Sequence, residues 1–285
     1  MEPAERYQRE REELGSALRR LRRDAGLTGV EAAQRAGMSQ SKISKIETAA
    51  LLPSVDDVDV LCHALSAPAE LRADLLDRTE RLHTEIDSFR AVQRRGLHCK
   101  QEEIGELEAE TISFRDFQPL AITGLLQTAA YMRQIFALFI SGVELGKAVT
   151  ARLERQAVLY DSSKRFTFLI PEGALRWRFC SNQAMLAQFD RIASIATLPN
   201  VRIGVIPWTA SVRELPLQGF GLYDDRLAIV GLETGEVRLR DPKDVAVYLK
   251  LFAALEESAV FGDEARAVLA RVADDYRRLG EPEPS

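Results

Sequence analysis

Residues 28–47 set the fold of the N-terminal part of the chain and read Thr28-Gly-Val-Glu-Ala-Ala-Gln-Arg-Ala-Gly-Met-Ser-Gln-Ser-Lys-Ile-Ser-Lys-Ile-Glu47. Thr28 followed three residues later by Glu31 is the pattern of a capping box, which opens a short helix. Gly37 can adopt the positive φ of a sharp turn, and Ser39 can cap a second helix after it. The stretch therefore predicts two short helices joined by a tight turn.

The second of these helices has an apolar side and a polar side. Ile43 and Ile46 are spaced to anchor it to a core, and Ala33 supplies the small residue that a close helix crossing needs. Its outer face carries short hydrogen-bonding side chains and cations: Gln40, Ser41, Lys42, Ser44 and Lys45. In a major groove, glutamine pairs with adenine, serine adapts to either base type, and lysine reaches guanine or phosphate. The face therefore indicates DNA binding, and the alternative is the solvated face of a dimerisation or protein-docking module.

The charge distribution favours the DNA-binding interpretation. The net charge of the 285 residues is −5, which by itself argues against a nucleic-acid binder. Between Leu14 and Leu51, however, seven Lys or Arg stand against three Asp or Glu, while the rest of the chain has 31 against 40. Because a binding field is local, this asymmetry indicates a basic N-terminal module joined to an acidic body.

Apolar periodicity predicts a multidomain chain. Five helices with inward stripes make residues 14–86 an all-α helix-turn-helix domain. Apolar runs separated by helical segments make residues 114–280 a mixed α/β (α+β) domain. Its expected strands are residues 166–170, 201–206, 220–223, 227–230 and 237–239. The other expected parts are a charged, frayed arm at 1–13, a helical connector at 87–113 and a disordered tail at 281–285.

Residues 14–66 resemble the helix-turn-helix of the Xre/Cro/C1 repressor family, whose recognition helix typically reads Ser-Gln-Ser-x-Ile-Ser-x-Ile-Glu. The resemblance implies a sequence-specific transcriptional regulator that reads DNA with residues 40–47. The sequence departs from the family at Gly29, where glutamine is usual, and at Ala49, where glycine is usual.

The same resemblance implies a role for each residue of the motif. Gln40, Ser41 and Lys45 would face base edges. Lys42 and Ser44 would lie near phosphates, together with Arg22 or Arg23 of the first helix, and Glu47 would face inward or bond a neighbouring helix. The predicted DNA-binding set is Arg22, Arg23, Thr28, Ser39, Gln40, Ser41, Lys42, Ser44 and Lys45.

A second resemblance lies in the C-terminal part. Residues 117–131 are similar to the Pro-Gly-Leu-Leu-Gln-Thr-x-x-Tyr signature of actinobacterial regulators, in which an Xre-type head precedes a conserved domain of unknown function. Residues 168–176 and 199–207 match later strands of that domain. This resemblance implies an antitoxin-like regulator, often encoded beside a small partner protein.

Polar and aromatic residues of this part suggest a further site. Six of them are expected to line a ligand pocket or a protein-binding groove: Gln127, Tyr131, Arg155, Glu172, Arg176 and Trp177. The alternative is that Glu172 and Arg176 only pair across one helical turn. Trp208 is either a packing plug or an interface anchor.

The expected partners follow from the geometry of DNA reading. One recognition helix covers a few base pairs, and specificity usually needs two half-sites about 34 Å apart. We therefore expect double-stranded DNA and a homodimer held by the C-terminal domain or the connector. Two alternatives remain open, namely a small partner protein bound by the C-terminal domain and a small-molecule effector bound near Gln127 and Trp177.

Signals for catalysis, metals and membranes are missing from the sequence. The three histidines lack ligand spacing, and neither a phosphate-binding glycine loop nor a nucleophile elbow is present. We therefore expect no cofactor, no metal and no enzymatic activity; an enzyme tethered to DNA would need a cleft that sequence cannot show. Three distant cysteines, the lack of a long apolar run and the lack of a secretory signal predict a cytoplasmic protein without a membrane span.

Overall fold

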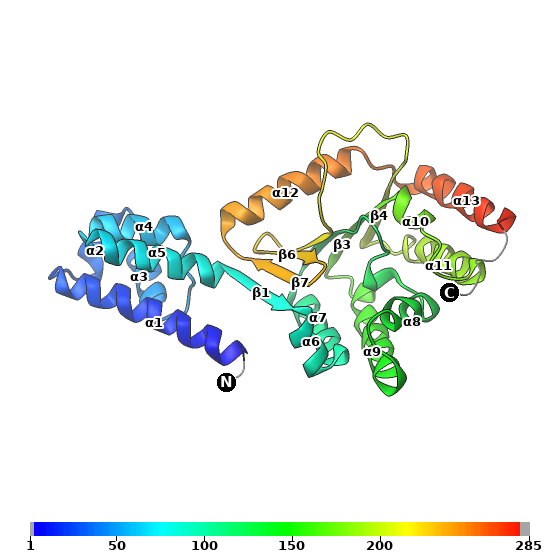
Figure 1. Ribbon diagram of the computed structural model, residues 1–285. Coiled ribbons are helices and arrows are strands. Elements are labelled where there is room, and N and C mark those ends of the chain that lie inside the picture. The colour runs from blue at the N-terminus through cyan, green and yellow to red at the C-terminus, as the bar shows by residue number, and fades with distance from the viewer. Residues whose placement is uncertain (1–2, 280–285) are drawn as a thin grey trace. The chain divides into compact units, whose positions relative to one another are not determined.

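The computed structural model describes residues 3–279, with side chains for residues 7–84 and 88–279. It divides into two compact units. Unit 1 holds the residues through Glu85 together with Leu239–Pro242, and unit 2 holds Ile86–Arg238 and the residues from Lys243 onward. The chain thus has the predicted two-domain organisation, in which a helical region precedes a mixed α/β region (Figure 1).

Unit 1 is built from helices. These are α1 (Pro3–Asp24), α2 (Gly29–Ala36), α3 (Gln40–Glu47), α4 (Val55–Ala64) and α5 (Ala69–His83). They enclose one apolar core, to which α1 contributes Leu14, Leu18 and Leu21, and α3 contributes Ile43 and Ile46.

The expected frayed arm is wrong, because α1 already begins at Pro3. Polar and charged residues one turn apart stabilise its first half: Gln8 donates to Glu12 at 2.9 Å, and Arg9 lies 3.5 Å from Glu13. Arg11 also donates to the carbonyl of Ala49 at 2.7 Å, which ties this segment to the chain that follows α3. Charge density without apolar spacing was therefore no sign of disorder.

Unit 2 is organised around a sheet. Its strands are β1 (Thr84–Ser88), which begins in unit 1, β2 (Ser113–Phe117), β3 (Arg165–Pro171), β4 (Val201–Ile206), β5 (Phe220–Tyr223), β6 (Leu227–Leu232) and β7 (Gly235–Leu239). The strand order is β1-β7-β6-β5-β2-β3-β4. β2, β3 and β4 run parallel, whereas β2 pairs with β5 and β5 with β6 in antiparallel fashion. The sheet is therefore mixed, and all five predicted strands are present within it, whereas β1 and β2 were not predicted.

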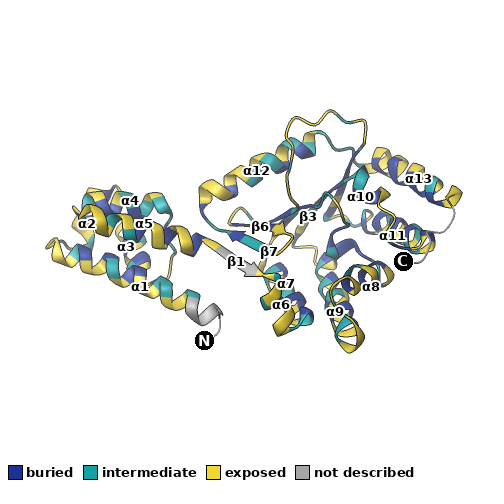
Figure 2. Cartoon of the chain, in the orientation of Figure 1, coloured by how far each residue is buried: buried dark blue, intermediate teal, exposed yellow. Residues whose placement is uncertain are grey.

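The helices of unit 2 surround this sheet. They are α6 (Phe89–Arg95), α7 (Leu97–Glu110), η1 (Gly124–Leu126), α8 (Ala129–Ala137), α9 (Gly142–Arg155), η2 (Gln156–Tyr160), α10 (Glu172–Arg176), α11 (Asn182–Ile195), α12 (Pro242–Glu257) and α13 (Gly262–Arg278). Alternate residues of β3, Phe166, Phe168 and Ile170, share the main core with α11 and α13. Figure 2 shows the consequence, with strands that are largely buried and helices that have one buried and one exposed side.

Residues 87–113 are not a connector, because they belong to unit 2 and contribute α6, α7 and the start of β2. The buried side of α7 is polar and includes Gln101 and Glu108. Both residues find partners on α9, where Arg155 bonds them. This polar burial explains why the segment reads as solvated in the sequence. The expected tail at 281–285 lies outside the described residues.

Candidate nucleic-acid interface

The turn between α2 and α3 is held by local hydrogen bonds. At the start of α2, the Thr28 hydroxyl accepts from the Glu31 backbone N–H at 3.3 Å, and the Glu31 carboxylate accepts from Thr28 N–H at 2.8 Å. These bonds from Thr28 lower the pKa of Glu31. Gly37 ends α2 at φ 62°, and the Ser39 hydroxyl accepts from Lys42 N–H at 3.1 Å to open α3. The predicted capping box, turn and cap all form.

The side chains of α3 divide as predicted between core and surface. Ile43 and Ile46 are 3% and 1% exposed. Four polar residues of the same helix are exposed: Gln40, Ser41, Ser44 and Lys45. Ser39 and Thr28, the two cap residues, are exposed as well. The helix therefore presents its short hydrogen-bonding side chains to solvent, the arrangement required to reach base edges.

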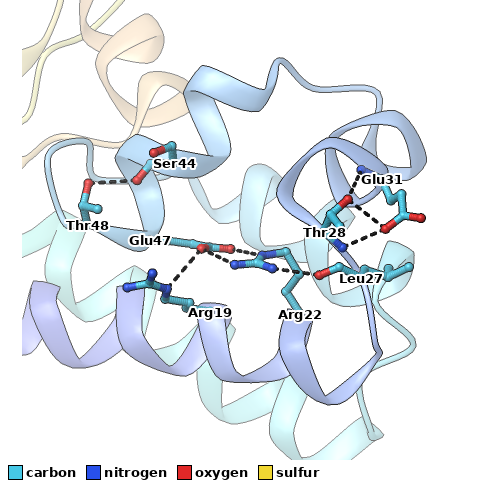
Figure 3. A network of polar contacts seen from close by, with 8 residues as sticks. All are labelled: Arg19, Arg22, Leu27, Thr28, Glu31, Ser44, Glu47 and Thr48. Atoms are coloured by element: carbon cyan, nitrogen blue, oxygen red, sulfur yellow. Dashed lines mark hydrogen bonds and ion pairs between the residues drawn. The ribbon is translucent and has the colours of Figure 1, made fainter.

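Arg22 has a structural position instead of the predicted phosphate-contacting one. Its guanidinium donates to both carboxylate oxygens of Glu47, at 2.5 and 2.8 Å, and to the carbonyl of Leu27 at 2.7 Å (Figure 3). The side chains of Arg22 and Glu47 are only 13% and 10% exposed, and this bond raises the pKa of Arg22. Arg19 lies 3.8 Å from the same carboxylate. The Arg22–Glu47 pair joins α1 to the end of α3. Glu47 was expected to bond a neighbouring helix, whereas Arg22 was expected to lie near phosphates.

Lys42 also differs from the expectation of a free cation near phosphate. Its ammonium group lies 2.7 Å from the carboxylate of Asp57, on the first turn of α4. Within the described part of unit 1, the cations without a carboxylate within ion-pair distance include Arg20, Arg23, Arg35 and Lys45, all exposed. These four side chains are therefore exposed cations of unit 1 that remain available to a polyanion.

The six residues expected to form one pocket are divided between two places in unit 2. Gln127, Tyr131 and Arg155 lie in the interior, where their polar groups bond to the protein itself. Glu172, Arg176 and Trp177 instead line an open cavity of about 590 Å³. The predicted single pocket is therefore wrong, because the two sets lie on different elements.

The interior set belongs to a buried network of amides and guanidinium groups. Arg155 forms a bidentate pair with Glu108 at 2.7 and 2.9 Å, and it donates to Gln101 at 2.7 Å. Arg152 donates to Gln101 at 2.9 Å and to Gln127 at 2.7 Å, so that both of its acceptors are neutral. Burial lowers the pKa of Arg152 to about 9. These side chains bond mainly to one another, and the geometry of the network fits a structural role.

The open set contains the predicted ion pair and two residues that the sequence did not single out together. Arg176 donates to Glu172 at 2.6 and 2.8 Å across one turn of α10. Trp208 and Arg271 complete the lining, one from the segment after β4 and one from α13. Trp208 is 79% exposed, which excludes the packing-plug interpretation. The parallel pairing of β3 with β4 brings the segments that carry Glu172 and Trp208 together, which the sequence alone does not show.

A small polar array lies at the start of α7. Glu144 accepts from the His98 ring nitrogen Nδ1 at 2.7 Å, and the opposite ring nitrogen lies 3.3 Å from the thiol of Cys99. This arrangement fixes the orientation of the imidazole. Gly96, at φ 99°, permits it, because a Cβ there would lie 2.7 Å from the His98 ring. His98 and Cys99 are adjacent in the sequence and could be recognised there, whereas Glu144 is distant in the chain and could not be predicted as their partner.

Among residues 7–84 and 88–279, whose side chains the structure describes, no group of three or more potential metal-ligating side chains is present. The same residues include no helix that is both long and apolar enough to cross a membrane.

Two family models match the chain. A helix-turn-helix domain matches residues 13–75, and a domain of unknown function, DUF5753, matches residues 101–271. No curated protein matches the chain.

Several solved structures are similar at low sequence identity. NucT from Helicobacter pylori is 10% identical with a TM-score of 0.35, covering 63% of this chain and 98% of its own. Nuc from Salmonella typhimurium, a phospholipase D family member, is 12% identical with a TM-score of 0.35, covering 63% and 97%. TrmBL2, an archaeal chromatin protein with a novel mode of DNA binding, is 12% identical with a TM-score of 0.33, covering 73% and 68%.

The DUF5753 model extends over more than half of the sequence, from α7 into α13. The helix-turn-helix model covers α2, α3 and α4 of unit 1 completely and α1 and α5 in part. The chain therefore belongs to the DUF5753 family and carries a helix-turn-helix domain in front of that domain.

Proposed function

We propose that the chain is a sequence-specific, DNA-binding transcriptional regulator of the Xre/Cro/C1 type. The observation that carries this proposal is the division of α3, which buries Ile43 and Ile46 and exposes the polar side chains between them. The match of residues 13–75 to a helix-turn-helix domain supports it. The proposed function involves no enzymatic step, cofactor or metal.

Base edges are read by the exposed residues Gln40, Ser41 and Lys45 in this proposal. Arg22 is paired with Glu47, and Lys42 is paired with Asp57. We therefore assign the phosphate contacts to Arg23 and Arg35 instead. Arg23 lies in the last turn of α1 and Arg35 in the last turn of α2, and both side chains are exposed. Ser44 keeps its predicted place near the DNA phosphates. Its backbone carbonyl accepts a hydrogen bond from the Thr48 hydroxyl at 2.8 Å, which leaves the Ser44 hydroxyl outside that bond.

We further propose that two copies act together, each reading one half-site, because a helix such as α3 spans too few base pairs for specificity alone. Because a transcriptional regulator must reach the chromosome, we propose that the protein is cytoplasmic. The resemblance of residues 117–131 to actinobacterial regulators is the basis for assigning it to that group.

A second candidate function is binding of a small partner protein, as in antitoxin-like regulators. The segment between β4 and β5 exposes apolar side chains, with Leu215 at 82%, Leu217 at 80% and Val212 at 43%. Large apolar side chains exposed together mark interaction surfaces. Purification of the chain from its native host tests this candidate: a stoichiometric small protein that is lost on Leu215→Ser/Leu217→Ser supports it, and recovery of the chain alone rejects it.

DNA binding is tested by selecting fragments of the native genome with the full chain and measuring affinity for an enriched fragment. Arg23→Ala should weaken binding to every DNA sequence alike and reduce the slope of log affinity against log salt by about 1. Arg81→Ala is the matched control, because Arg81 is an exposed cation of α5 that is paired with Asp77. Failure to enrich any fragment would reject the proposed function.

A further inference from the structure

We propose that unit 2 binds a small planar aromatic acid in the cavity between α10, the segment after β4, and α13. This cavity has a volume of about 590 Å³ and is lined by Glu172, Gly173, Arg176, Trp177, Trp208, Thr209 and Arg271. Small-molecule sites typically measure about 300–1,000 Å³. The proposal goes beyond DNA binding and does not depend on it.

The position of the cavity in the fold is that of a ligand site. β3 and β4 are parallel, and their last residues, Pro171 and Ile206, are paired in register. The two chain segments therefore leave the sheet at the same edge, where Glu172 follows β3 directly and Trp208 lies two residues beyond the end of β4. Ligands of open α/β sheets bind outside the carboxyl ends of parallel strands.

The aromatic lining is held in place although it is exposed. Trp177 and Trp208 are 56% and 79% exposed, and they are the only tryptophans of the chain. The backbone N–H of Trp208 donates to Glu172 at 2.9 Å, and the carbonyl of Trp177 accepts from the Tyr276 hydroxyl at 3.1 Å. A Cβ at Gly173 would lie 3.7 Å from the Trp208 ring, so that this ring rests against the glycine. Both indoles are thus fixed at their backbones and offer flat apolar surface for stacking.

Glu172 holds Trp208 and Arg176 in place, and Arg176 compensates its negative charge. It is 6% exposed, and its other carboxylate oxygen accepts both bonds from Arg176. Burial raises the pKa of Glu172, but the bonds from Trp208 and Arg176, together with the charges of Arg176 and Arg271, outweigh that effect, and the pKa is lowered overall. Arg176 also donates to Asp275 at 2.8 Å. Neither charge of this pair is therefore available to a ligand.

Arg271 is the charge that remains for a ligand. It is exposed, lines the cavity, and has no carboxylate within ion-pair distance among residues 7–84 and 88–279. With Glu172 and Arg176 compensating each other, the lining carries one positive charge. Stacking surface beside a single unpaired guanidinium fits a flat ring that bears a carboxylate.

Fluorine NMR of the full chain labelled with 5-fluorotryptophan tests the inference, since the label reports only from this cavity. Trp177→Phe and Trp208→Phe assign the two resonances. The probe is 2-naphthoate, and 2-naphthamide is the uncharged control with the same ring system. We expect 2-naphthoate to shift both resonances in a saturable manner and to bind more tightly than the amide.

Arg271→Gln should weaken 2-naphthoate binding by about tenfold and leave 2-naphthamide binding unchanged. Arg266→Gln, which removes an exposed arginine from the same helix outside the cavity lining, should change neither. Absence of any shift at millimolar 2-naphthoate overturns the inference. Equal binding of acid and amide that is unaffected by Arg271→Gln also overturns it, because it reveals an apolar patch alone. Neither outcome affects the DNA-binding proposal.

Discussion

At the scale of single residues, the helix-turn-helix depends on backbone conformations and on one compensated charge pair. Gly37 occupies the left-handed region at the turn, at φ 62°. Ala49 also adopts a left-handed conformation, at φ 57°, although it is not a glycine. Its carbonyl accepts from Arg11, a bond that helps to hold this unfavourable conformation. At position 49, an alanine can therefore occupy the left-handed conformation because the bond from Arg11 helps to maintain the turn.

Gly37→Ala should destabilise unit 1 by about 1 kcal/mol, because a Cβ is disfavoured at positive φ even where space is open. Amide hydrogen exchange of α1–α3 in the full chain measures this change. The control is Gly29→Ala, at a helical position where a Cβ would make ordinary contact with Gln40. A stability loss at Gly29 equal to that at Gly37 would contradict the conformational explanation.

Arg22→Ala should destabilise unit 1 by about 2 kcal/mol, because it leaves the Glu47 carboxylate mostly buried without its bidentate partner. Arg72→Ala is the matched control, since it breaks a more exposed Arg–Asp pair and should destabilise unit 1 less than Arg22→Ala does. Denaturation followed by circular dichroism compares the two. Unchanged stability together with uniformly weaker DNA binding would return Arg22 to the phosphate-contacting set.

At the scale of elements, α1 and α3 cross so closely that their backbones touch. A Cβ at Gly15 would lie only 2.7 Å from the carbonyl oxygen of Ile46 and 3.1 Å from that of Glu47. The position of α3, and with it the presentation of its outer face, is therefore set by a glycine on α1.

Gly15→Ala should displace α3 and destabilise unit 1 by about 1–3 kcal/mol, the usual range for overpacking. DNA affinity should fall with it even at temperatures where the variant remains folded. Ser16→Ala, an exposed neighbour on the same helix, should change stability by less than about 0.5 kcal/mol. Equal stability of the two variants would show that the crossing has room to adjust.

The same scale explains how much the sequence could predict. The capping box, Gly37, Ser39 and the Ile43–Ile46 pair are local signals, and each one appears in the structure as predicted. The apolar strands were also recognisable, whereas β2 was missed because Arg115 and Asp116 interrupt its apolar residues. Residues that pair at long range gave no such signal: Arg22 with Glu47, and Lys42 with Asp57.

At the scale of the whole molecule, two units with different chemistry follow one another. Both units surround an apolar core, and unit 2 also buries a group of ionisable residues on neighbouring elements, among them Glu108, Asp116 and Arg155. Burial of charge makes the stability of unit 2 sensitive to pH. The two units can therefore be distinguished in solution by their response to pH.

The stability of unit 2 should decrease as pH rises from about 4 to 7. Desolvation raises the pKa of Asp116 from 3.8 to about 7, although Gln118 donates to the carboxylate. The folded chain therefore holds the Asp116 proton more tightly than the unfolded chain, and the slope should approach about 1.4 kcal/mol per pH unit. Urea denaturation followed by tryptophan fluorescence reports on unit 2, which contains both tryptophans. Asp116→Asn should reduce the slope, and an unchanged slope would assign the pH dependence to other groups.

The most direct test of the central claim compares the DNA sequences selected by the wild-type chain and by Gln40→Ala. If the exposed face of α3 reads base edges, the two proteins should enrich different bases at one position of each half-site and the same bases elsewhere. Identical preferences with equally reduced affinity on every sequence would contradict base reading by this helix.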